Sequence, residues 1–351
     1  MESTATVGDG ARLRADARIR LEPSRTRTPT ELRAMLQRAV QIEMATLPPY
    51  LYAFFSTGDA NQPAIDRLHH IWHEEMVHMV LACNILNAIG GRPRIADAAV
   101  VPMYPHKLPF SLDDDLPVSL IPFSKAAMEQ GMGIERPEDP LVFMATADAP
   151  DFHTIGQFYD SLKEPLRTLP LPWGKGPDRQ LGDGQFFPGE IFPVRNADDA
   201  VRAIDHIVSE GEGAKDTPLD FGGELSHYYR FQEMALNKVL QRAPDQPHGF
   251  AWGPSLGIDF SQAVAAITDP ATHDLSGFPE VQAAQDRCDR AFTSMLREIQ
   301  RAVNGEPGRL GNAVGDMLTL RREAIRAFAI PFGTPALSAG PAFRFRPDLL
   351  A

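Results

Sequence analysis

The sequence predicts an all-α protein built on a four-helix bundle, and three observations support this fold class. Apolar residues recur at helical spacing over long stretches of the 351-residue chain. The 31 prolines gather between those stretches rather than inside them, as helix boundaries do. The pattern Glu-x-x-His occurs in two of the helical stretches, at 75–78 and 224–227. Residues three apart lie on one face of a helix, so the two side chains of each pair can bind the same ion.

Composition narrows the classes of function. The chain has a formal net charge of −12 and 43% hydrophobic residues, which is the content of an ordinary globular protein. An acidic surface favours neither nucleic acid nor anionic membranes as partners, and no apolar run is long enough to span a bilayer. The first 27 residues lack the apolar segment of a secretory signal. With only Cys83 and Cys288 present, we expect free thiols and a cytoplasmic protein.

The first bundle helix is expected to begin at Thr28, an N-cap that forms a capping box with Glu31. An apolar face over residues 32–40 continues to Glu43. A Glu in a core stripe costs several kcal/mol unless a cation or a proton neutralises it. The alternative is that the helix frays and Glu43 reaches water. Pro48-Pro49 should kink or interrupt the helix.

The second helix is expected from about Pro63 to the stop at Gly90-Gly91. Glu75 and His78 fall inside its apolar stripe, in line with leucine and isoleucine residues. A single Glu-x-x-His is more often a solvated turn of a helix surface than a site. The second copy of the spacing favours the metal interpretation here.

Four more polar residues of this helix need separate interpretation. Glu74 points away from the stripe and can pair with His70 four residues earlier, so we interpret both as surface residues. His69 and His73 are also four apart, which is compatible with metal binding. They share a face with apolar residues rather than with Glu75, which favours a role in packing.

Two further bundle helices are expected after residue 195. Asn196 caps the third, and its apolar stripe leads to Glu212. Glu210 lies on nearly the opposite side, so Glu212 is the preferred ligand. The fourth helix is expected to carry Glu224 and His227 on one face.

The remaining segments are placed around this bundle. We expect a long irregular insertion between helices 2 and 3, with at most two short strands and one short helix, and such excursions are often lids or pocket walls. Two extra C-terminal amphipathic helices should pack on the bundle or on a second subunit, so a homodimer is an option. The expected boundaries are a disordered or extended tail at 1–27, a bundle at 28–245 with its insertion at 92–195, strands near 99–103 and 187–194, a helix at 155–164, and a C-terminal extension at 246–351 with helices at 281–303 and 309–329.

The predicted site combines four carboxylates with two imidazoles. Its members are Glu43, Glu75, His78, Glu212, Glu224 and His227. One Glu from each of two helices and Glu-x-x-His from each of the others is the donor set of ferritin-like di-metal carboxylate bundles. Mixed oxygen and nitrogen donors suit two divalent ions, iron before manganese or zinc. Calcium would need oxygen donors alone, and structural zinc would need thiolates. Without metal, four buried carboxylates would repel one another and take up protons.

The chain also resembles a known family, in segments that surround these residues. The segments are Glu74-Glu75-Met76-Val77-His78-Met79, Ala82-Cys83-Asn84-Ile85-Leu86-Asn87-Ala88-Ile89-Gly90-Gly91, Gly211-Glu212-Gly213 and Glu224-Leu225-Ser226-His227-Tyr228. They resemble the ferritin-like domain of bacterial iminophenylpyruvate dimer synthase proteins, whose relatives form part of the large imine-dimerising enzymes of violacein and indolocarbazole biosynthesis. The resemblance covers roughly residues 28–345. It implies metal binding at the same six positions and favours Glu212 over Glu210.

The expected function is a non-haem di-metal, preferably di-iron, oxidase or oxygenase that uses O2 on a small organic substrate in specialised metabolism. Imino-acid coupling, which the resemblance implies, is the alternative. Ferroxidation for iron handling ranks last, because cage-forming ferritins are much shorter and lack such an insertion. Tyr50, Tyr159 and Tyr228 are weaker candidates for substrate contact, since buried aromatic packing explains them better.

Overall fold

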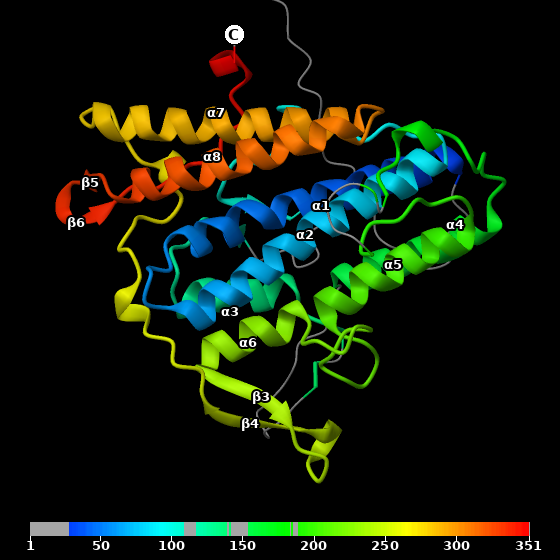
Figure 1. Ribbon diagram of the computed structural model, residues 1–351, viewed down its shortest axis with the longest axis horizontal. Coiled ribbons are helices and arrows are strands. Elements are labelled where there is room, and N and C mark those ends of the chain that lie inside the picture. The colour runs from blue at the N-terminus through cyan, green and yellow to red at the C-terminus, as the bar shows by residue number, and fades with distance from the viewer. Residues whose placement is uncertain are drawn as a thin grey trace, which may run out of the picture.

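The computed structural model describes residues 28–108, 117–138, 140–141, 154–182, 184 and 189–350, so the expected tail at 1–27 lies outside the described residues. Two long helices, α1 (Pro29–Phe55) and α2 (Gln62–Ala88), pack along their length and form the centre of the molecule (Figure 1). No helix in these ranges combines the length and apolar character needed to cross a membrane.

Helix α1 begins as predicted. The backbone N–H of Glu31 donates to Thr28 Oγ1 at 3.2 Å, and the N–H of Thr28 donates to Glu31 Oε2 at 2.8 Å. This reciprocal pair is the capping box that the sequence indicates, and it satisfies donors that the first turn leaves open.

The expected interruption at Pro48-Pro49 is wrong, because α1 continues through both prolines to Phe55. Pro49 has no N–H to donate to the carbonyl of Ala45 four residues earlier. The hydroxyl of Tyr104 donates to that carbonyl instead, at 2.7 Å. A tertiary hydrogen bond thus satisfies the buried carbonyl that proline leaves unpaired.

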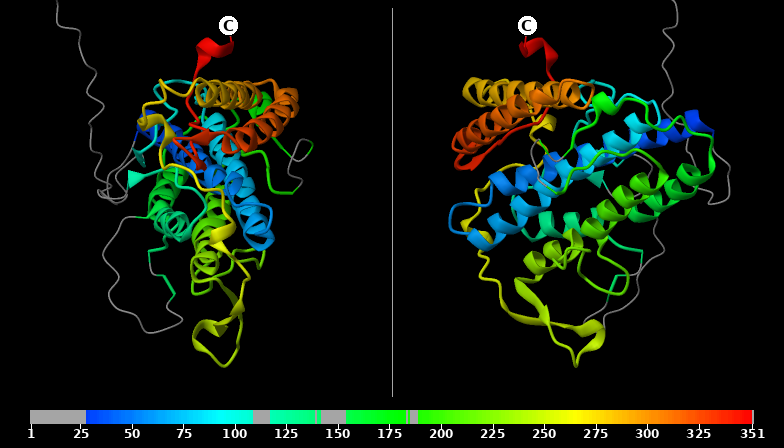
Figure 2. Two further views of the ribbon diagram at one scale, coloured as in Figure 1. Left: turned by 90° about the vertical axis from the view of Figure 1, so that its left-hand side faces the viewer. Right: turned by 45° about the vertical axis from the view of Figure 1, so that its right-hand side comes forward.

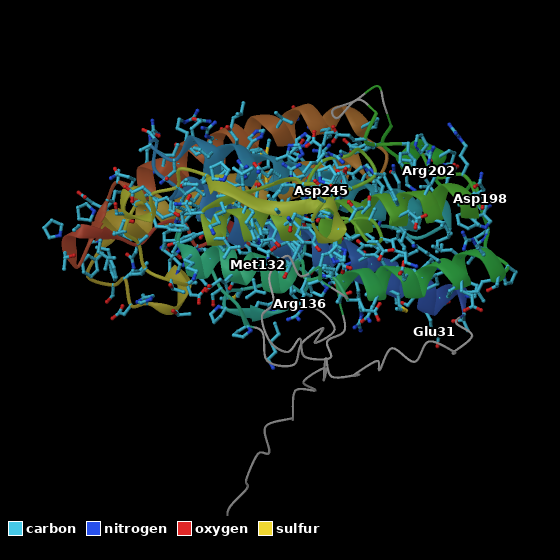
Figure 3. The ribbon with its side chains drawn as sticks, turned by 90° about the horizontal axis from the view of Figure 1, so that it is seen from below. Glu31, Met132, Arg136, Asp198, Arg202 and Asp245 are labelled. Atoms are coloured by element: carbon cyan, nitrogen blue, oxygen red, sulfur yellow. The ribbon has the colours of Figure 1, made fainter. Side chains whose placement is uncertain are left out.

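Each of the other two sides of the bundle is built from two short helices. One side holds α3 (Lys125–Ile134) and α4 (Ile155–Thr168), and the other holds α5 (Ala197–Glu212) and α6 (His227–Leu236). α3 packs on α6 and α4 packs on α5, while α1 contacts the side of α3 and α4 and α2 contacts the side of α5 and α6 (Figure 2). The bundle therefore consists of two continuous helices and two interrupted ones.

The region 92–195 is irregular over much of its described length, as expected, but it also supplies α3 and α4. The sequence predicted α4 and missed α3. Ser124 caps α3 by accepting from the N–H of Ala127 at 3.2 Å. The strands differ as well, because β1 (His106–Lys107) pairs with β2 (Pro117–Val118) and no strand forms at 99–103 or in the described part of 187–194.

The two C-terminal helices form as predicted. α7 (Pro279–Ala302) and α8 (Leu310–Phe328) pack against each other and lie over the bundle, with α8 in contact with α1 (Figures 1 and 2). Cys83 and Cys288 are buried free thiols, also as predicted. The sequence did not indicate the short remaining elements: β3 (Lys238–Arg242) with β4 (Phe250–Ser255), β5 (Pro331–Phe332) with β6 (Thr334–Ser338), and the 3-10 turns η1 (Pro177–Arg179), η2 (Pro247–Gly249), η3 (Phe260–Gln262), η4 (Pro270–Thr272), η5 (Pro307–Arg309) and η6 (Pro347–Leu350).

A buried amide attaches the loop after α4 to α2. The side chain of Asn84 is fully buried; its Nδ2 donates to the carbonyls of Leu181 at 2.8 Å and Phe192 at 3.0 Å. Its Oδ1 accepts from the N–H of Leu181 at 3.0 Å. These bonds satisfy loop backbone groups that have no neighbouring strand or helix to pair with.

We predict that Asn84→Ala lowers the free energy of unfolding by about 3 kcal/mol, because it leaves several buried backbone groups unpaired. Urea denaturation of the variant measures the change. Asn312→Ala is the matched control, since Asn312 is exposed and makes one hydrogen bond to Glu298, and it should change stability by less than about 0.5 kcal/mol. Equal effects of the two substitutions would contradict the anchoring role.

Candidate metal centre

Four of the six predicted ligands meet in the middle of the bundle. Glu43 comes from α1, Glu75 and His78 come from α2, and His227 opens α6. None of these residues is more than 2% exposed. His227 Nδ1 lies 2.9 Å from Glu75 Oε1, while His78 Nδ1 lies 3.6 Å from the same oxygen and 3.7 Å from Glu43 Oε2.

The two imidazoles share one orientation, with Nδ1 toward the centre and Nε2 toward an outer carboxylate. His78 Nε2 lies 2.7 Å from Glu210 Oε2, and His227 Nε2 lies 2.8 Å from Glu74 Oε2. A carboxylate on one ring nitrogen orients the ring and favours the proton on that nitrogen. The inner nitrogens are thereby left as electron-pair donors.

One inner nitrogen has no hydrogen-bond partner. Within the described ranges, His227 Nδ1 is a buried atom that makes no hydrogen bond, although Glu75 Oε1 is 2.9 Å away. A ring nitrogen and a carboxylate oxygen at this distance need a cation between them, either a proton or a metal ion. The donor set of imidazole nitrogens and carboxylate oxygens fits a transition metal such as iron.

Glu135 joins the cluster, although the sequence interpretation missed it. It follows the last residue of α3, is 4% exposed, and places Oε2 3.8 Å from His227 Nδ1. Its other oxygen accepts a hydrogen bond from the hydroxyl of Tyr50. The sequence did contain a helical pattern here, because Met128, Gly131 and Glu135 keep helical spacing inside a segment that we interpreted as irregular.

Glu212, at the end of α5, faces the same cluster from the other interrupted side. It accepts a hydrogen bond from the N–H of Gly156 at 2.7 Å, near the start of α4. A Cβ at Gly156 would lie 2.5 Å from Glu212 Oε2, so only glycine allows this approach. Glu212 and the cluster line a cavity of about 10 Å³, room for a group the size of a water molecule. The lining residues are Glu43, Glu75, His78, Glu135, Ile155, Gly156, Ile207, Val208, Gly211 and Glu212.

Glu224 does not lie in the cluster, which corrects the prediction that it shares a helical face with His227. Its side chain is 58% exposed and contacts Arg230 at 2.7 Å and His70 at 3.1 Å. α6 begins only at His227. Glu224 is held in the preceding turn, where its N–H donates to Asp220 Oδ1 at 2.9 Å. The second Glu-x-x-His is therefore a sequence pattern without the helical geometry.

Glu74 and Glu210 also differ from their predicted roles. Both are 8% exposed, and each supports an imidazole of the cluster rather than lying on the surface or facing away. The expected pair of His70 with Glu74 is present at 2.7 Å. Although burial opposes ionisation, hydrogen bonds from His227 and His70 hold the pKa of Glu74 well below its usual range.

The other aromatic and histidine candidates separate into two groups. Tyr159 donates a hydrogen bond to Glu43, as Tyr50 does to Glu135, so both phenols contact the cluster. Tyr228 packs against Tyr229 in a separate apolar cluster. The rings of His69 and His73 stack with centroids 6.3 Å apart; His69 also packs on Trp72, and His73 Nδ1 lies 3.9 Å from Glu190 Oε2.

Burial and mutual contact set the protonation of the metal-free cluster. Burial raises the pKa of Glu43 to about 7 and that of Glu212 to about 8. Burial opposes the charged imidazolium, yet neighbouring carboxylates raise the pKa of His78 and His227 well above 6.5. The inner carboxylates of Glu43, Glu75, Glu135 and Glu212 carry formal charge −4 when ionised, so without metal the cluster holds protons instead.

Comparison with known proteins defines the class to which this fold and cluster belong. Residues 36–236 match the family model described as Ferritin-like. The chain therefore belongs to the ferritin-like family, which confirms the predicted fold class.

Individual proteins resemble the chain over most of its length. The chain is 25% identical to 2-imino-3-(indol-3-yl)propanoate dimerase of Chromobacterium violaceum over 91% of its length, and 26% identical to dichlorochromopyrrolate synthase of Lentzea aerocolonigenes over 92%. It spans 34% and 37% of those two proteins. A crystal structure of a ferritin-like protein from Caulobacter vibrioides superposes with a TM-score of 0.58 at 21% identity, covering 91% of this chain and 99% of that one. The expected resemblance to a ferritin-like domain with imine-dimerising relatives is confirmed.

The metal-free protein should lose thermal stability between about pH 5 and about pH 8. The folded-state pKa values of Glu43 and Glu212 lie above the ordinary value of 4.5, so their contribution is complete below 4.5 and is lost as the pH rises to about 7 and 8. His78 and His227 act in the same direction, because their raised pKa values hold protons that the unfolded chain releases near 6.5.

Melting curves of chelator-treated protein measure this dependence, and we expect the Tm to fall by several degrees over the range. Glu212→Gln removes one of the groups, so its Tm should fall less steeply between about pH 5 and pH 8. A Tm that rises over this interval would contradict the described electrostatics.

Proposed function

We propose that this chain binds two divalent metal ions, iron before manganese, at the inner cluster and acts as a non-haem oxidase or oxygenase on a small organic molecule. The orientation of the two imidazoles is the observation that supports it. Both Nδ1 atoms face Glu75 while both Nε2 atoms are occupied by outer carboxylates. This arrangement of a metal-binding histidine with an outer carboxylate is common around metals.

The cluster divides into two similar halves that would each hold one ion. Glu75 lies between the imidazoles, with Oε1 2.9 Å from His227 Nδ1 and 3.6 Å from His78 Nδ1. Glu43 stands on the His78 side, and Glu135 stands on the His227 side. Donor atoms of Glu75, His78 and His227 all lie within 4.8 Å of one another. Glu75 would be the shared ligand, and Glu212 would complete the set from the cavity wall.

When bound, a pair of redox-active ions supplies electrons for the reduction of O2. The protein's own residues position the carboxylate ligands and exclude water from the cluster. Tyr159 and Tyr50 donate hydrogen bonds to Glu43 and Glu135 and so fix the rotamers of those two carboxylates. Phe231 packs on Tyr50 with ring centroids 5.0 Å apart, which closes the cluster with apolar surface.

Imino-acid coupling is the second candidate, and the named relatives favour it. The inner cavity is too small for an aromatic substrate, but a cavity of about 500 Å³ lies outside α5. Its lining includes Arg167 and Arg202, which suit a carboxylate, and Phe192, which suits an aromatic ring. His206 in the same lining lies 3.3 Å from Glu210, the outer partner of His78. A substrate there would be linked to the cluster through two side chains.

The metal part of the proposal predicts about two iron or manganese ions per chain in anaerobically reconstituted protein. Glu75→Gln should remove most of the metal, because it deletes the shared charged ligand while keeping the side-chain shape. Glu224→Gln is the matched control and should keep the wild-type content, since Glu224 lies on the surface. Elemental analysis of the three proteins measures the ratio.

Two results would overturn this assignment. Wild-type protein without bound metal after reconstitution would remove the metal proposal. Equal loss in Glu224→Gln and Glu75→Gln would show that the ligand set follows the Glu-x-x-His pattern rather than the described geometry. Circular dichroism of each variant separates loss of metal from loss of fold.

The coupling alternative predicts dimeric product from 2-imino-3-(indol-3-yl)propanoate, generated in place from tryptophan by an amino-acid oxidase and followed by mass spectrometry. Arg202→Gln should raise KM about tenfold by removing a carboxylate partner, with unchanged metal content. Arg290→Gln, at an exposed position of α7, is the control for a lost surface charge. Product no faster than in the enzyme-free mixture would eliminate this activity for the chain.

A further inference from the structure

A third cavity, at the opposite end of the bundle from the α3–α6 contact, has a lining of unusual charge. It measures about 710 Å³, and its walls come from the start of α1, the end of α2, the loop after α4 and the connection between α7 and α8, which gather at one end of the molecule (Figure 1). The lining residues are Arg33, Ile89, Gly90, Arg92, Pro172, Lys175, Gly176, Asp178, Arg179 and Asn304. We infer that this cationic pocket binds a small polyanion with phosphate or carboxylate groups.

The pocket is positively charged, whereas the whole chain is negatively charged. Four cationic side chains and one carboxylate line it, so its formal charge is +3, whereas the chain carries −12. Within the described residues, none of Arg33, Arg92, Lys175 and Arg179 lies within 4 Å of a carboxylate oxygen, although many other cations of the protein do. Cations gathered without counter-ions repel one another, and an anionic ligand would offset that repulsion.

Arg179 is held in position before any ligand binds. Its guanidinium lies against Gly176, where a Cβ would meet Nη2 at 2.5 Å and Nε at 2.6 Å. Gly176 has a φ of +58°, so glycine serves both the backbone turn and the space for the guanidinium. The carbonyl of Arg179 accepts from Asn87 Nδ2 at 3.2 Å, which ties this segment to α2.

The Nε–H group of Arg179 has an unusual environment. Its Nε is enclosed and has no hydrogen-bond partner in the described structure. The charge of the guanidinium is therefore not neutralised by a protein acceptor at this atom, and it remains available to an anion in the pocket. Fixing the guanidinium in advance also lowers the entropy that binding must overcome.

Capping of α2 explains only part of this charge. Arg33 Nη1 donates to the carbonyl of Ile89 at 3.3 Å, and a cation is favourable at this end of a helix. Arg92, Lys175 and the Nε of Arg179 make no such contact among the described bonds. The positive charge therefore exceeds what the helix end requires.

The chemistry of the lining defines the ligand class. Guanidinium groups bind phosphate and carboxylate oxygens in pairs, and three of the four cations are arginines. The volume lies within the usual range for small-molecule sites. Arg33 precedes Glu43 on α1 by ten residues, about 15 Å along the helix, so this pocket is separate from the candidate metal centre.

Isothermal titration calorimetry of the full chain with pyrophosphate, at about 0.15 M salt, tests the inference. We expect saturable binding that Arg179→Gln weakens at least tenfold and Lys175→Gln weakens less. Arg290→Gln removes an exposed charge of α7 outside the pocket and should bind as the wild type does. A parallel titration with citrate distinguishes a carboxylate ligand from a phosphate ligand. Tighter citrate binding assigns a polycarboxylate, and tighter pyrophosphate binding assigns a phosphorylated ligand.

The inference fails if neither anion binds the wild type, or if Arg290→Gln weakens binding as much as Arg179→Gln does. Thermal melts accompany each variant, so that a tenfold loss of affinity counts only where the Tm is unchanged. Metal content should be the same in all of these proteins, which keeps the result independent of the inner cluster.

Discussion

The burial of carboxylates around two imidazoles is the constraint on which the rest of this structure depends. Glu43, Glu75 and Glu135 are almost completely enclosed, and Glu212 faces the same small cavity. An isolated buried carboxylate is costly, and a group of them is tolerable only with protons or metal ions between them. The outer carboxylates Glu74 and Glu210 extend this requirement, because they fix the rings that face inward.

The interrupted helices follow from the same constraint. Glu135 and His227 come from the ends of α3 and α6 that meet, while Glu212 and Gly156 come from the meeting ends of α5 and α4. A helix end presents side chains and backbone N–H groups in directions that a continuous helix cannot offer. The continuous pair α1 and α2 supplies Glu43, Glu75 and His78 on rigid elements. The cluster thus combines a rigid half with a half built from helix termini.

The sequence predicted the fold class and the rigid half well, because both depend on local patterns. Apolar spacing, the Thr28 capping box and the position of Glu75 and His78 within a stripe are properties of one helix each. The half of the cluster that is built from helix termini depends on the residues at which helices begin and end. The turn that contains Asp220 delays the start of α6 to His227 and turns Glu224 into solvent, and no periodicity indicates such a turn. Glu135 was missed because α3 is only ten residues long and lies between irregular segments.

We propose that the inner cluster, rather than the outer carboxylates, is the metal site. Crystals grown with ferrous iron and measured at the iron absorption edge test it most directly, because anomalous scattering locates the ions. We expect two iron peaks, one beside His78 Nδ1 and one beside His227 Nδ1, with Glu75 between them. Iron confined to the outer group of Glu74, Glu210 and Asp220, or an inner cluster without iron, would contradict it.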